Sequence, residues 1–442
     1  MSNRSKKVLV LAIDAVLLAL ALFLSLALRR LTFPETGIFF KHLLFFLPTF
    51  LFELLVFYIA GLYDFSQLSR MRFLVTRLFD AIAASTIFAV AWSYLFPSDD
   101  LAPKTMLAIL AALSFILLLA WRRISGRLAN HYLPRVKVGV IGQRKHIEII
   151  GQEIAVRPYL GLELAASFDV NLDTDNILTG VRQKSLAKLI ISSKDIENRP
   201  EISTNLLSCL SLGIEFIELA DFYEQITGKV PIDEIDRLWF LDNIRESRRR
   251  PYNLLKRIAD LAVSLVILAI SLPAWPFIAL IIKLGSKGPV LFRQARSGQD
   301  GKPFTILKFR TMREEGNERA MTVDNDSRIT RFGKFLRDTR LDEIPQMLNI
   351  IRGEMSLIGP RPERPEFIDD LEAKIPFYRT RLLIKPGLTG WDQISGQYHS
   401  ASLEDTYQKL QYDLFYLKHR SFYLDFTIIL KTVSTVIGKG GR

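Results

Sequence analysis

Two adjacent carboxylates, Asp342 and Glu343, lie in a stretch of residues 308–364 that contains many cations. The cations nearest to them in this stretch are Lys308, Arg310, Arg331, Arg337, Arg340, Arg352, Arg361 and Arg364. Carboxylate oxygens bind hard metal ions, and guanidinium groups bind phosphates in a fixed geometry. Residues 308–364 are therefore the candidate active site, with a metal and an anionic substrate as its expected ligands.

Pro345 predicts where these carboxylates lie. Proline is tolerated in the first turn of a helix, so we expect a helix over about 345–351 with Asp342 at or next to its N-cap. The positive end of that helix would then face both side chains. Asp342 could be only a cap and Glu343 only a first-turn charge. Alternatively, Asp342 could be a nucleophile and magnesium ligand, because aspartates form acyl-phosphates.

The composition indicates a membrane protein of several domains. The chain has 442 residues, 49% of them hydrophobic, and a net charge of +12. This charge suits nucleic acid or an anionic membrane, and the long apolar segments favour the membrane, so we expect no nucleic-acid partner. The single cysteine excludes a disulfide framework within the chain, and the scattered histidines exclude a zinc-type spacing. Any metal is expected to be bound by oxygen atoms.

Apolar stretches at 8–28, 43–62, 78–96 and 104–121 predict four transmembrane helices within a domain at residues 1–130. The segments after the second and fourth stretches are basic (Arg70, Arg72, Arg77, Arg122, Arg123, Arg127), whereas residues 97–100 are acidic. By the positive-inside rule, both ends of this bundle face the cytoplasm.

Short β-rich runs alternate with helical stretches between residues 136 and 220, which predicts a Rossmann-like α/β domain with a parallel sheet at 131–230. Its first turn offers only Gly139 and Gly142, so the three-glycine dinucleotide fingerprint is missing. We expect a vestigial or regulatory module in preference to an active cofactor site. A basic linker at 231–252 follows, and its run at 245–250 could hold lipid phosphates.

The apolar segment at 261–282 is long enough to span a membrane but contains Pro273 and Pro276. Cations flank it on both sides, so both ends read as cytoplasmic. We therefore predict a re-entrant hairpin at about 256–284, broken at Pro273, with a proline-kinked span as the alternative. A full span would place residues 308–364 outside the cell.

Beyond the hairpin we expect extended segments at 290–294 and 304–309 around a turn at 299–303. The glycine-rich and proline-rich loop at 385–391 could carry a base on Trp391, form a lid, or be only a turn. An amphipathic helical region at 407–437 is expected to lie at the membrane interface. The chain should thus combine a transmembrane bundle, the α/β domain, and a mainly α-helical catalytic domain at 253–442.

Six sequence blocks follow one another in order from about residue 253 onward: KRIAD (256–260), GPVLF (288–292), KFRTM (308–312), LDEIPQ (341–346), GEMSLIGPRP (353–362) and PGLTGW (386–391). With these blocks the chain resembles the bacterial sugar transferases, the monotopic polyprenyl-phosphate phosphoglycosyl transferases. The preceding regions resemble the long members of the family, with residues 131–230 as a CoA-binding-like domain. Residues 218–224 and 227–231 are similar to a subgroup linked to exopolysaccharide and protein-sorting loci.

The resemblance implies transfer of hexose-1-phosphate from a UDP-sugar to undecaprenyl phosphate at the cytoplasmic face of the bacterial inner membrane, with release of UMP. This step would initiate an exopolysaccharide, O-antigen or capsule. The implied roles are Asp342 as covalent nucleophile and Mg²⁺ ligand, Glu343 as its catalytic partner, Arg337 and Arg361 as phosphate ligands, Lys308 and Arg310 in the matching basic motif, and Pro273 as the helix break. Leu272 replaces a frequent serine, and Asp392 replaces a frequent alanine.

Other functions stay open at this stage. A catalytically inactive membrane-tethered sensor or scaffold for polysaccharide assembly is the main alternative, and a multi-span transferase without a covalent intermediate is another. We also expect contacts with membrane lipids, and a homodimer, which the α/β domain could pair. The residues do not specify which sugar is transferred.

Overall fold

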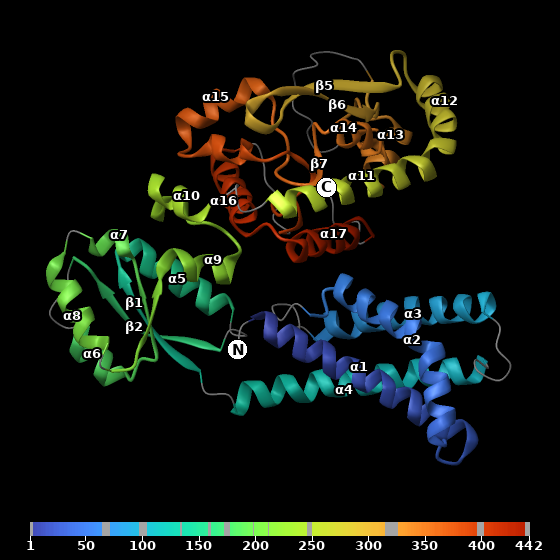
Figure 1. Ribbon diagram of the computed structural model, residues 1–442, viewed down its shortest axis with the longest axis horizontal. Helices are drawn as coiled ribbons and strands as arrows, with labels where there is room; N and C mark the ends of the chain where they lie inside the picture. Colours follow the sequence, from blue (N-terminus) through green and yellow to red (C-terminus); the bar gives the residue numbers. More distant parts are fainter. Residues whose placement is uncertain are drawn as a thin grey trace.

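The computed structural model describes residues 3–63, 71–96, 104–132, 135–157, 161–171, 177–197, 199–210, 212–244, 250–313, 326–395 and 402–437. Figure 1 shows a long helical bundle, an α/β domain beside it, and a C-terminal part above the bundle. This arrangement confirms the predicted fold class.

The N-terminal bundle is formed by α1 (Asn3–Arg30), α2 (Thr36–Ile59), α3 (Met71–Leu95) and α4 (Lys104–Tyr132). Each helix contains a segment long and apolar enough to cross a membrane: Val8–Arg29, Thr36–Ile59, Leu74–Leu95 and Thr105–Ile124. Side chains such as Leu22, Phe46 and Leu118 are buried between the helices, whereas Leu44 and Ile87 are exposed. Apolar side chains on the outside are expected where lipid replaces water. Arg70 and residues 97–100, which the orientation prediction used, lie outside the described residues.

The α/β domain contains β1 (Val136–Gly142), α5 (Arg144–Val156), β2 (Leu162–Asp169), α6 (Ile177–Lys184), β3 (Lys188–Ile191), α7 (Ser193–Ile196), α8 (Pro200–Leu210), β4 (Glu215–Glu218) and α9 (Leu219–Thr227). The strands are parallel, as predicted, and the sheet has the order β2-β1-β3-β4. Alternate residues of β1 enter different cores: Val138 and Val140 pack with α5 and α9, whereas Ile141 packs with α6 and α8. Helices therefore cover both faces of the sheet.

A linker of η3 (Ile232–Glu234) and α10 (Arg237–Asn243) leads to the C-terminal part. Residues 245–249 of the predicted basic run lie outside the described residues. After them comes α11 (Arg250–Ser271), then η5 (Leu272–Ala274) and α12 (Trp275–Gly285). Figure 1 shows α12 turning away from the line of α11, so the helix breaks at Pro273 as predicted.

The apolar segment Arg250–Gly285 is scarcely buried by the protein itself, with 6% of its most apolar window inside. Polar side chains in the first turns of α11 nevertheless bind to the C-terminal part. The Arg257 Nη2 donates to the Ile351 carbonyl at 2.8 Å, and the buried Asp260 accepts from the Leu357 amide at 3.2 Å. At the other end, the Trp275 ring packs edge-on against Phe309. Both arms of the broken helix are thus fixed to the same body.

The C-terminal part begins with β5 (Leu291–Ser297), η6 (Gln299–Gly301) and β6 (Pro303–Phe309), the predicted antiparallel pair. It continues with α13 (Arg331–Asp338), η7 (Leu341–Glu343), α14 (Gln346–Arg352), β7 (Ser356–Ile358), α15 (Pro365–Lys374), η8 (Tyr378–Leu383), β8 (Gly387–Thr389), η9 (Asp392–Ile394), α16 (Leu403–His419) and α17 (Phe422–Ile437). The parallel β7–β8 pair was not predicted, because each strand has only three residues.

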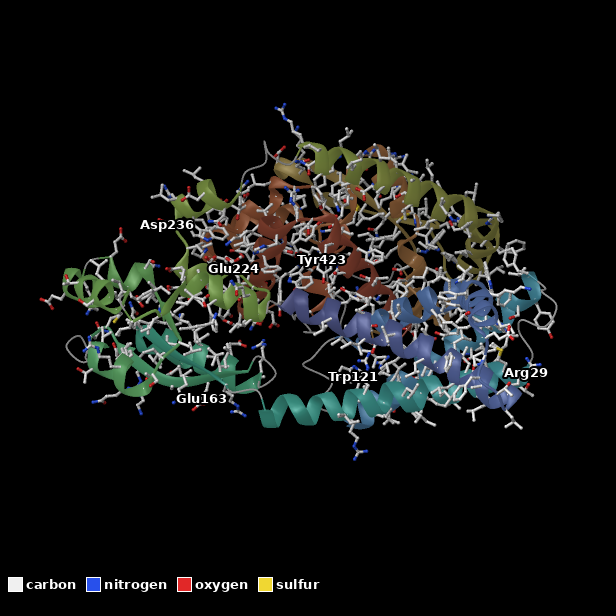
Figure 2. The ribbon with its side chains drawn as sticks, turned by 60° about the horizontal axis from the view of Figure 1, so that its bottom comes forward. Arg29, Trp121, Glu163, Glu224, Asp236 and Tyr423 are labelled. Atoms are coloured by element: carbon white, nitrogen blue, oxygen red, sulfur yellow. The ribbon has the colours of Figure 1, made fainter. Side chains whose placement is uncertain are left out.

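The C-terminal part contacts each of the other two parts through polar side chains. Lys418 of α16 forms an ion pair with Glu224 of α9 at 2.9 Å, and Tyr58 of α2 shares a hydrogen bond with Thr427 of α17 at 3.0 Å. Figure 2 shows Glu224 where the α/β domain meets the C-terminal part. The C-terminal part is therefore held by both other parts.

Candidate active site

A short turn between α13 and α14 carries Asp342 and Glu343. Arg340 has a left-handed backbone (φ 58°) that reverses the chain after α13 and starts the separate turn η7. The following helix begins at Gln346 with Pro345 as its N-cap, within one residue of the prediction. The prediction that Asp342 is at or next to the N-cap is wrong, because Asp342 lies in the separate turn η7, three residues before the N-cap Pro345. Asp342 therefore does not serve as the cap of this helix.

Glu343 is an ion-pair partner of two cations from distant segments. Its Oε1 lies 2.7 Å from the Lys308 Nζ on β6 and 3.4 Å from the Arg361 Nη2. Burial would raise the pKa of Glu343, but the charges of Lys308 and Arg361 outweigh burial and lower the pKa to about 2. Glu343 is therefore a permanent negative charge at neutral pH.

Asp342 has the opposite environment although it is the next residue. It is buried, and its Oδ1 has no hydrogen-bond partner among the described residues. Burial, together with the negative charge of Glu343, raises the pKa of Asp342 to about 6 against the pull of Lys308, Arg337 and Arg340. A buried oxygen without a partner is costly, so this atom is suited to receive a metal ion or to attack an electrophile.

The predicted phosphate ligands surround this turn. Arg361 lies in the loop after β7, and its side chain is 38% exposed. Arg337, at the end of α13, donates from Nε to the Thr311 hydroxyl at 2.8 Å, which leaves its terminal nitrogens for another acceptor. Burial lowers the pKa of Lys308, opposed by Glu343. Lys308, Arg337 and Arg361 thus bring positive charge to both carboxylates from separate elements.

Arg310 has a different position from the other cations. It is buried, and its Nη2 donates to the carbonyl of Ser286, the residue that ends α12, at 2.8 Å. Its guanidinium therefore joins β6 to the second arm of the broken helix. This geometry favours a positioning role for Arg310 over direct contact with a substrate.

The loop that carries Arg361 is held by buried charges that the sequence analysis missed. The Arg381 Nη2 lies 2.7 Å from the Asp413 Oδ2 and donates to the Arg361 carbonyl at 3.0 Å. Arg296 donates to the Pro362 carbonyl at 3.2 Å. No local pattern could reveal this network, because its members come from β5, η8 and α16.

Close backbone packing explains the glycines of this loop. A Cβ atom on Gly387 would lie 2.1 Å from the amide nitrogen of Gly359, so only glycine allows β8 to approach the GPRP segment at 359–362. The pairing of β7 with β8 therefore fixes the backbone of the loop that carries Arg361.

Trp391 is fixed by contacts with two other segments of the protein. Its ring stacks on Phe415 at 5.6 Å, and its Nε1 donates to the Gly228 carbonyl at 2.9 Å. Among the three interpretations of this loop, these contacts favour a structural role, because the ring joins the C-terminal part to the C-terminal end of α9. The neighbouring Asp392 is buried and interacts electrostatically with Asp413.

The described residues do not contain a cluster of three or more histidine, cysteine, aspartate or glutamate side chains that could hold a metal ion. Mg²⁺ often binds to one or two carboxylates and completes its shell with substrate phosphates and water. The unpartnered Oδ1 of Asp342 fits that mode. A metal held jointly with a diphosphate is therefore compatible with this site.

The broken apolar helix, the carboxylate pair and the converging cations define a membrane protein with a phosphate-handling site. Comparison with family models matches residues 251–439 to the bacterial sugar transferases and residues 58–183 to a CoA-binding domain. The chain belongs to the bacterial sugar transferase family, as the sequence motifs indicated.

Several relatives support this assignment. A UDP-N-acetylgalactosamine-undecaprenyl-phosphate N-acetylgalactosaminephosphotransferase from Aeromonas hydrophila is 36% identical over 241 residues, 54% of this chain and 56% of that protein. A UDP-glucose:undecaprenyl-phosphate glucose-1-phosphate transferase from Caulobacter vibrioides is 42% identical over 188 residues, 42% of this chain and 70% of the relative. One of the same name from Xanthomonas campestris is 30% identical over 334 residues, 69% of this chain and 67% of the relative. The chain thus spans little more than half of the Aeromonas protein.

Proposed function

We propose that this protein transfers a hexose-1-phosphate from a UDP-sugar to undecaprenyl phosphate, releasing UMP and forming an undecaprenyl-diphosphate sugar. The observation that carries the proposal is the unpartnered, buried Asp342 oxygen beside Glu343 and its two cations. The names of the relatives supply the substrate class.

The first step is an attack by an oxygen of Asp342 on the sugar-bearing phosphorus. A bond forms between this oxygen and phosphorus, and the bond from phosphorus to the bridging oxygen breaks, so that UMP leaves with the electron pair. A raised pKa makes the Asp342 carboxylate a stronger base than a solvated one while it remains mostly ionised at neutral pH.

The second step resolves the phosphosugar-aspartate. A phosphate oxygen of undecaprenyl phosphate attacks the same phosphorus, and the bond to Asp342 breaks. Arg361 and Arg337 would bind the phosphoryl oxygens in both steps, because Arg361 contacts Glu343 and the charge of Arg337 acts on Asp342. Glu343 holds Lys308 and Arg361 in place and stays ionised throughout.

Asp342, together with the substrate diphosphate, would hold a Mg²⁺ ion. When bound, the metal neutralises phosphate charge and so lets an anionic carboxylate approach an anionic substrate. Glu343 is an unsuitable ligand because its Oε1 already contacts Lys308 and Arg361.

The broken helix would place this site at the depth of the lipid phosphate. A re-entrant hairpin at the inner leaflet of the bacterial inner membrane keeps the C-terminal part in the cytoplasm, where UDP-sugars are. Exposed cations near its ends, such as Lys283 and Lys287, suit contact with anionic lipids. The product would begin an exopolysaccharide or O-antigen chain, and a homodimer remains part of this proposal.

The test is UMP release from a panel of UDP-sugars by detergent-extracted protein with Mg²⁺ and undecaprenyl phosphate. We expect release with at least one donor, abolished in Asp342→Asn and retained in Asp338→Asn. Asp338 is a matched control because it is an exposed carboxylate at the end of α13, four residues away. Without lipid acceptor, the wild type should release UMP only up to about the amount of enzyme.

Two results would contradict the proposal. Absence of release with every donor, from folded protein, would favour the scaffold function. UMP release that strictly requires prior binding of the lipid phosphate would favour a direct transfer without the aspartyl intermediate.

A further inference from the structure

The α/β domain has the place where parallel sheets of this type bind ligands. Its strand order β2-β1-β3-β4 reverses between β1 and β3, and ligands bind at the carboxyl ends of the strands on either side of such a reversal. In this protein Gly142 ends β1, and Ser192 follows β3. The crevice between them is the expected site of a nucleotide phosphate.

Carboxylates of the chain itself already accept hydrogen bonds from the backbone amides that would bind an anion in this crevice. The Gln143 amide, which precedes α5, donates to the Asp195 Oδ2 at 2.8 Å. The Ser193 amide donates to the Glu218 Oε1 at 3.1 Å. A Cβ atom on Gly142 would lie 3.2 Å from the Asp195 Oδ2, so this glycine makes room for a side chain of the same domain.

A further carboxylate, Glu234, enters the crevice from the linker. Its Oε1 lies 2.9 Å from the His146 Nε2, and its Oε2 accepts from the Ser192 hydroxyl at 2.8 Å. The other ring nitrogen of His146 lies 3.0 Å from Asp195. The Glu234 side chain is only 4% exposed. Glu234 thus sits where an acidic ligand would bind.

The same linker is fixed on its other side to the C-terminal part. Val230, Ile232 and Ile235 are buried in one core with Leu410 and Leu414 of α16. The Val230 amide also donates to the Gln411 carbonyl at 3.0 Å. The apolar side chains of this segment therefore enter the C-terminal core, while its acidic Glu234 enters the α/β domain.

Little space remains beside Glu234. A cavity of about 50 Å³ is lined by residues that include His146, Tyr223, Glu234 and Tyr407. Pockets for drug-sized ligands have volumes of roughly 300–1,000 Å³. A nucleotide or CoA could enter only if Glu234 left.

We propose that the crevice of the α/β domain is the binding site for the chain's own Glu234, so that the domain is a docking clamp for the linker and not a nucleotide- or CoA-binding module. The clamp holds η3 between α5 and α16. This role is independent of the transfer reaction, and it departs from the name of the family model that matches this region.

Hydrogen exchange of the full chain in detergent tests the clamp directly. Glu234→Ala removes both contacts, and Glu234→Gln keeps the shape but removes the charge. The control is Asp236→Asn, whose carboxylate only caps α10 by accepting from the Trp239 amide. Figure 2 labels Asp236 on the linker.

We expect exchange in segments 139–150 and 188–197 to rise at least about tenfold in Glu234→Ala, less in Glu234→Gln, and not in Asp236→Asn. Unchanged exchange in both Glu234 variants would overturn the clamp. If Glu234→Ala fails to fold, the comparison of Glu234→Gln with Asp236→Asn decides the question.

A second experiment tests the exclusion of nucleotides. CoA, NAD and ATP are each added to the wild type at 1 mM, a concentration on the order of the weakest common substrate KM values. We expect no added protection in either segment. Protection of 139–150 by any of these ligands in the wild type would overturn the proposal.

Discussion

The Nζ of Lys308 lies 2.7 Å from the Oε1 of Glu343, across a sequence separation that no local pattern bridges. This ion pair leaves the adjacent Asp342 with a buried oxygen that has no hydrogen-bond partner among the described residues. The two carboxylates consequently differ in pKa, about 6 for Asp342 and about 2 for Glu343. Asp342 is thereby suited to attack an electrophile, and Glu343 is suited to hold cations.

The pH dependence of UMP release should follow Asp342. Burial raises its pKa to about 6, and only the ionised form attacks, so single-turnover release should fall about tenfold per pH unit well below that value. The measurement is the rate of the UMP burst between pH 5 and 8 at saturating donor. A rate that stays constant down to pH 5 would contradict the role of Asp342.

Neutralising Asp342 should stabilise the folded protein at high pH. Its folded pKa of about 6 lies above the usual 3.8, so its stabilising contribution is complete below pH 3.8 and is lost as the pH rises through 6. At pH 8, Asp342→Asn should gain up to about 3 kcal/mol, since one pKa unit corresponds to about 1.4 kcal/mol.

Thermal midpoints at pH 8 and pH 5 provide the measurement for this variant. The gain should shrink toward pH 5, and Asp338→Asn should show no comparable effect at either pH. A variant that is less stable than the wild type at pH 8 would show that the Asp342 carboxylate is stabilised in the fold, contrary to this prediction.

Removing the charge of Glu343 should destabilise the protein. Glu343→Gln leaves the half-buried Lys308, whose side chain is 21% exposed, without its buried counter-ion, a loss of up to about 3–5 kcal/mol. The pKa of Glu343 is lowered to about 2, so its contribution is present above pH 4.5 and lost as the pH falls through 2. The deficit of the variant should therefore be the same at pH 8 and pH 6.

The double variant Lys308→Met/Glu343→Met separates stability from activity. It removes both charges and should recover most of the thermal midpoint, whereas UMP release should remain lost in both the single and the double variant. If the double variant were as unstable as Glu343→Gln, the ion pair would not be the source of the loss.

The re-entrant hairpin predicts that residues on both sides of Pro273 face the cytoplasm. In a Cys209→Ser background, Asn253→Cys and Lys287→Cys provide exposed thiols at the two ends of the hairpin. A membrane-impermeant maleimide should label neither thiol in spheroplasts and both in inverted vesicles. Labelling of exactly one of the two in spheroplasts would indicate a full span instead.

The contact of His146 with Glu234 should weaken at high pH. Hydrogen bonding to Glu234 raises the pKa of His146, against burial and with support from Asp195. Lys145, Asp233, Tyr223 and Tyr407 are the other titratable groups around this contact. Because the folded pKa is raised, the stabilisation is complete below 6.5 and is lost as the pH rises through the folded value.

The measurement is the exchange rate of segment 139–150 in the wild type relative to His146→Gln. The protection of the wild type over the variant should be largest near pH 6 and should decline toward pH 9. A difference that does not change over this range would show that the charge of His146 does not hold the linker.

The sequence alone determined the elements that depend on local patterns. Apolar length predicted the helices α1 to α4, and short β-rich runs predicted strands β1 to β6, because these signals lie within a few neighbouring residues. Pro273 likewise located the break between α11 and α12, because proline removes a helical hydrogen bond wherever it occurs. The motif around Asp342 and Glu343 identified the family for the same reason.

Only the tertiary structure decided how those residues differ. Asp342 and Glu343 are neighbours in sequence, but burial and the cations of β6 and the Arg361 loop give the two carboxylates different pKa values. Asp342 lies in the separate turn η7 and not at the cap of α14, and the Trp391 indole donates to the Gly228 carbonyl. Glu234 reached a crevice built by β1 and β3. Electrostatic environment and packing depend on residues far apart in the chain, and therefore no local pattern could predict them.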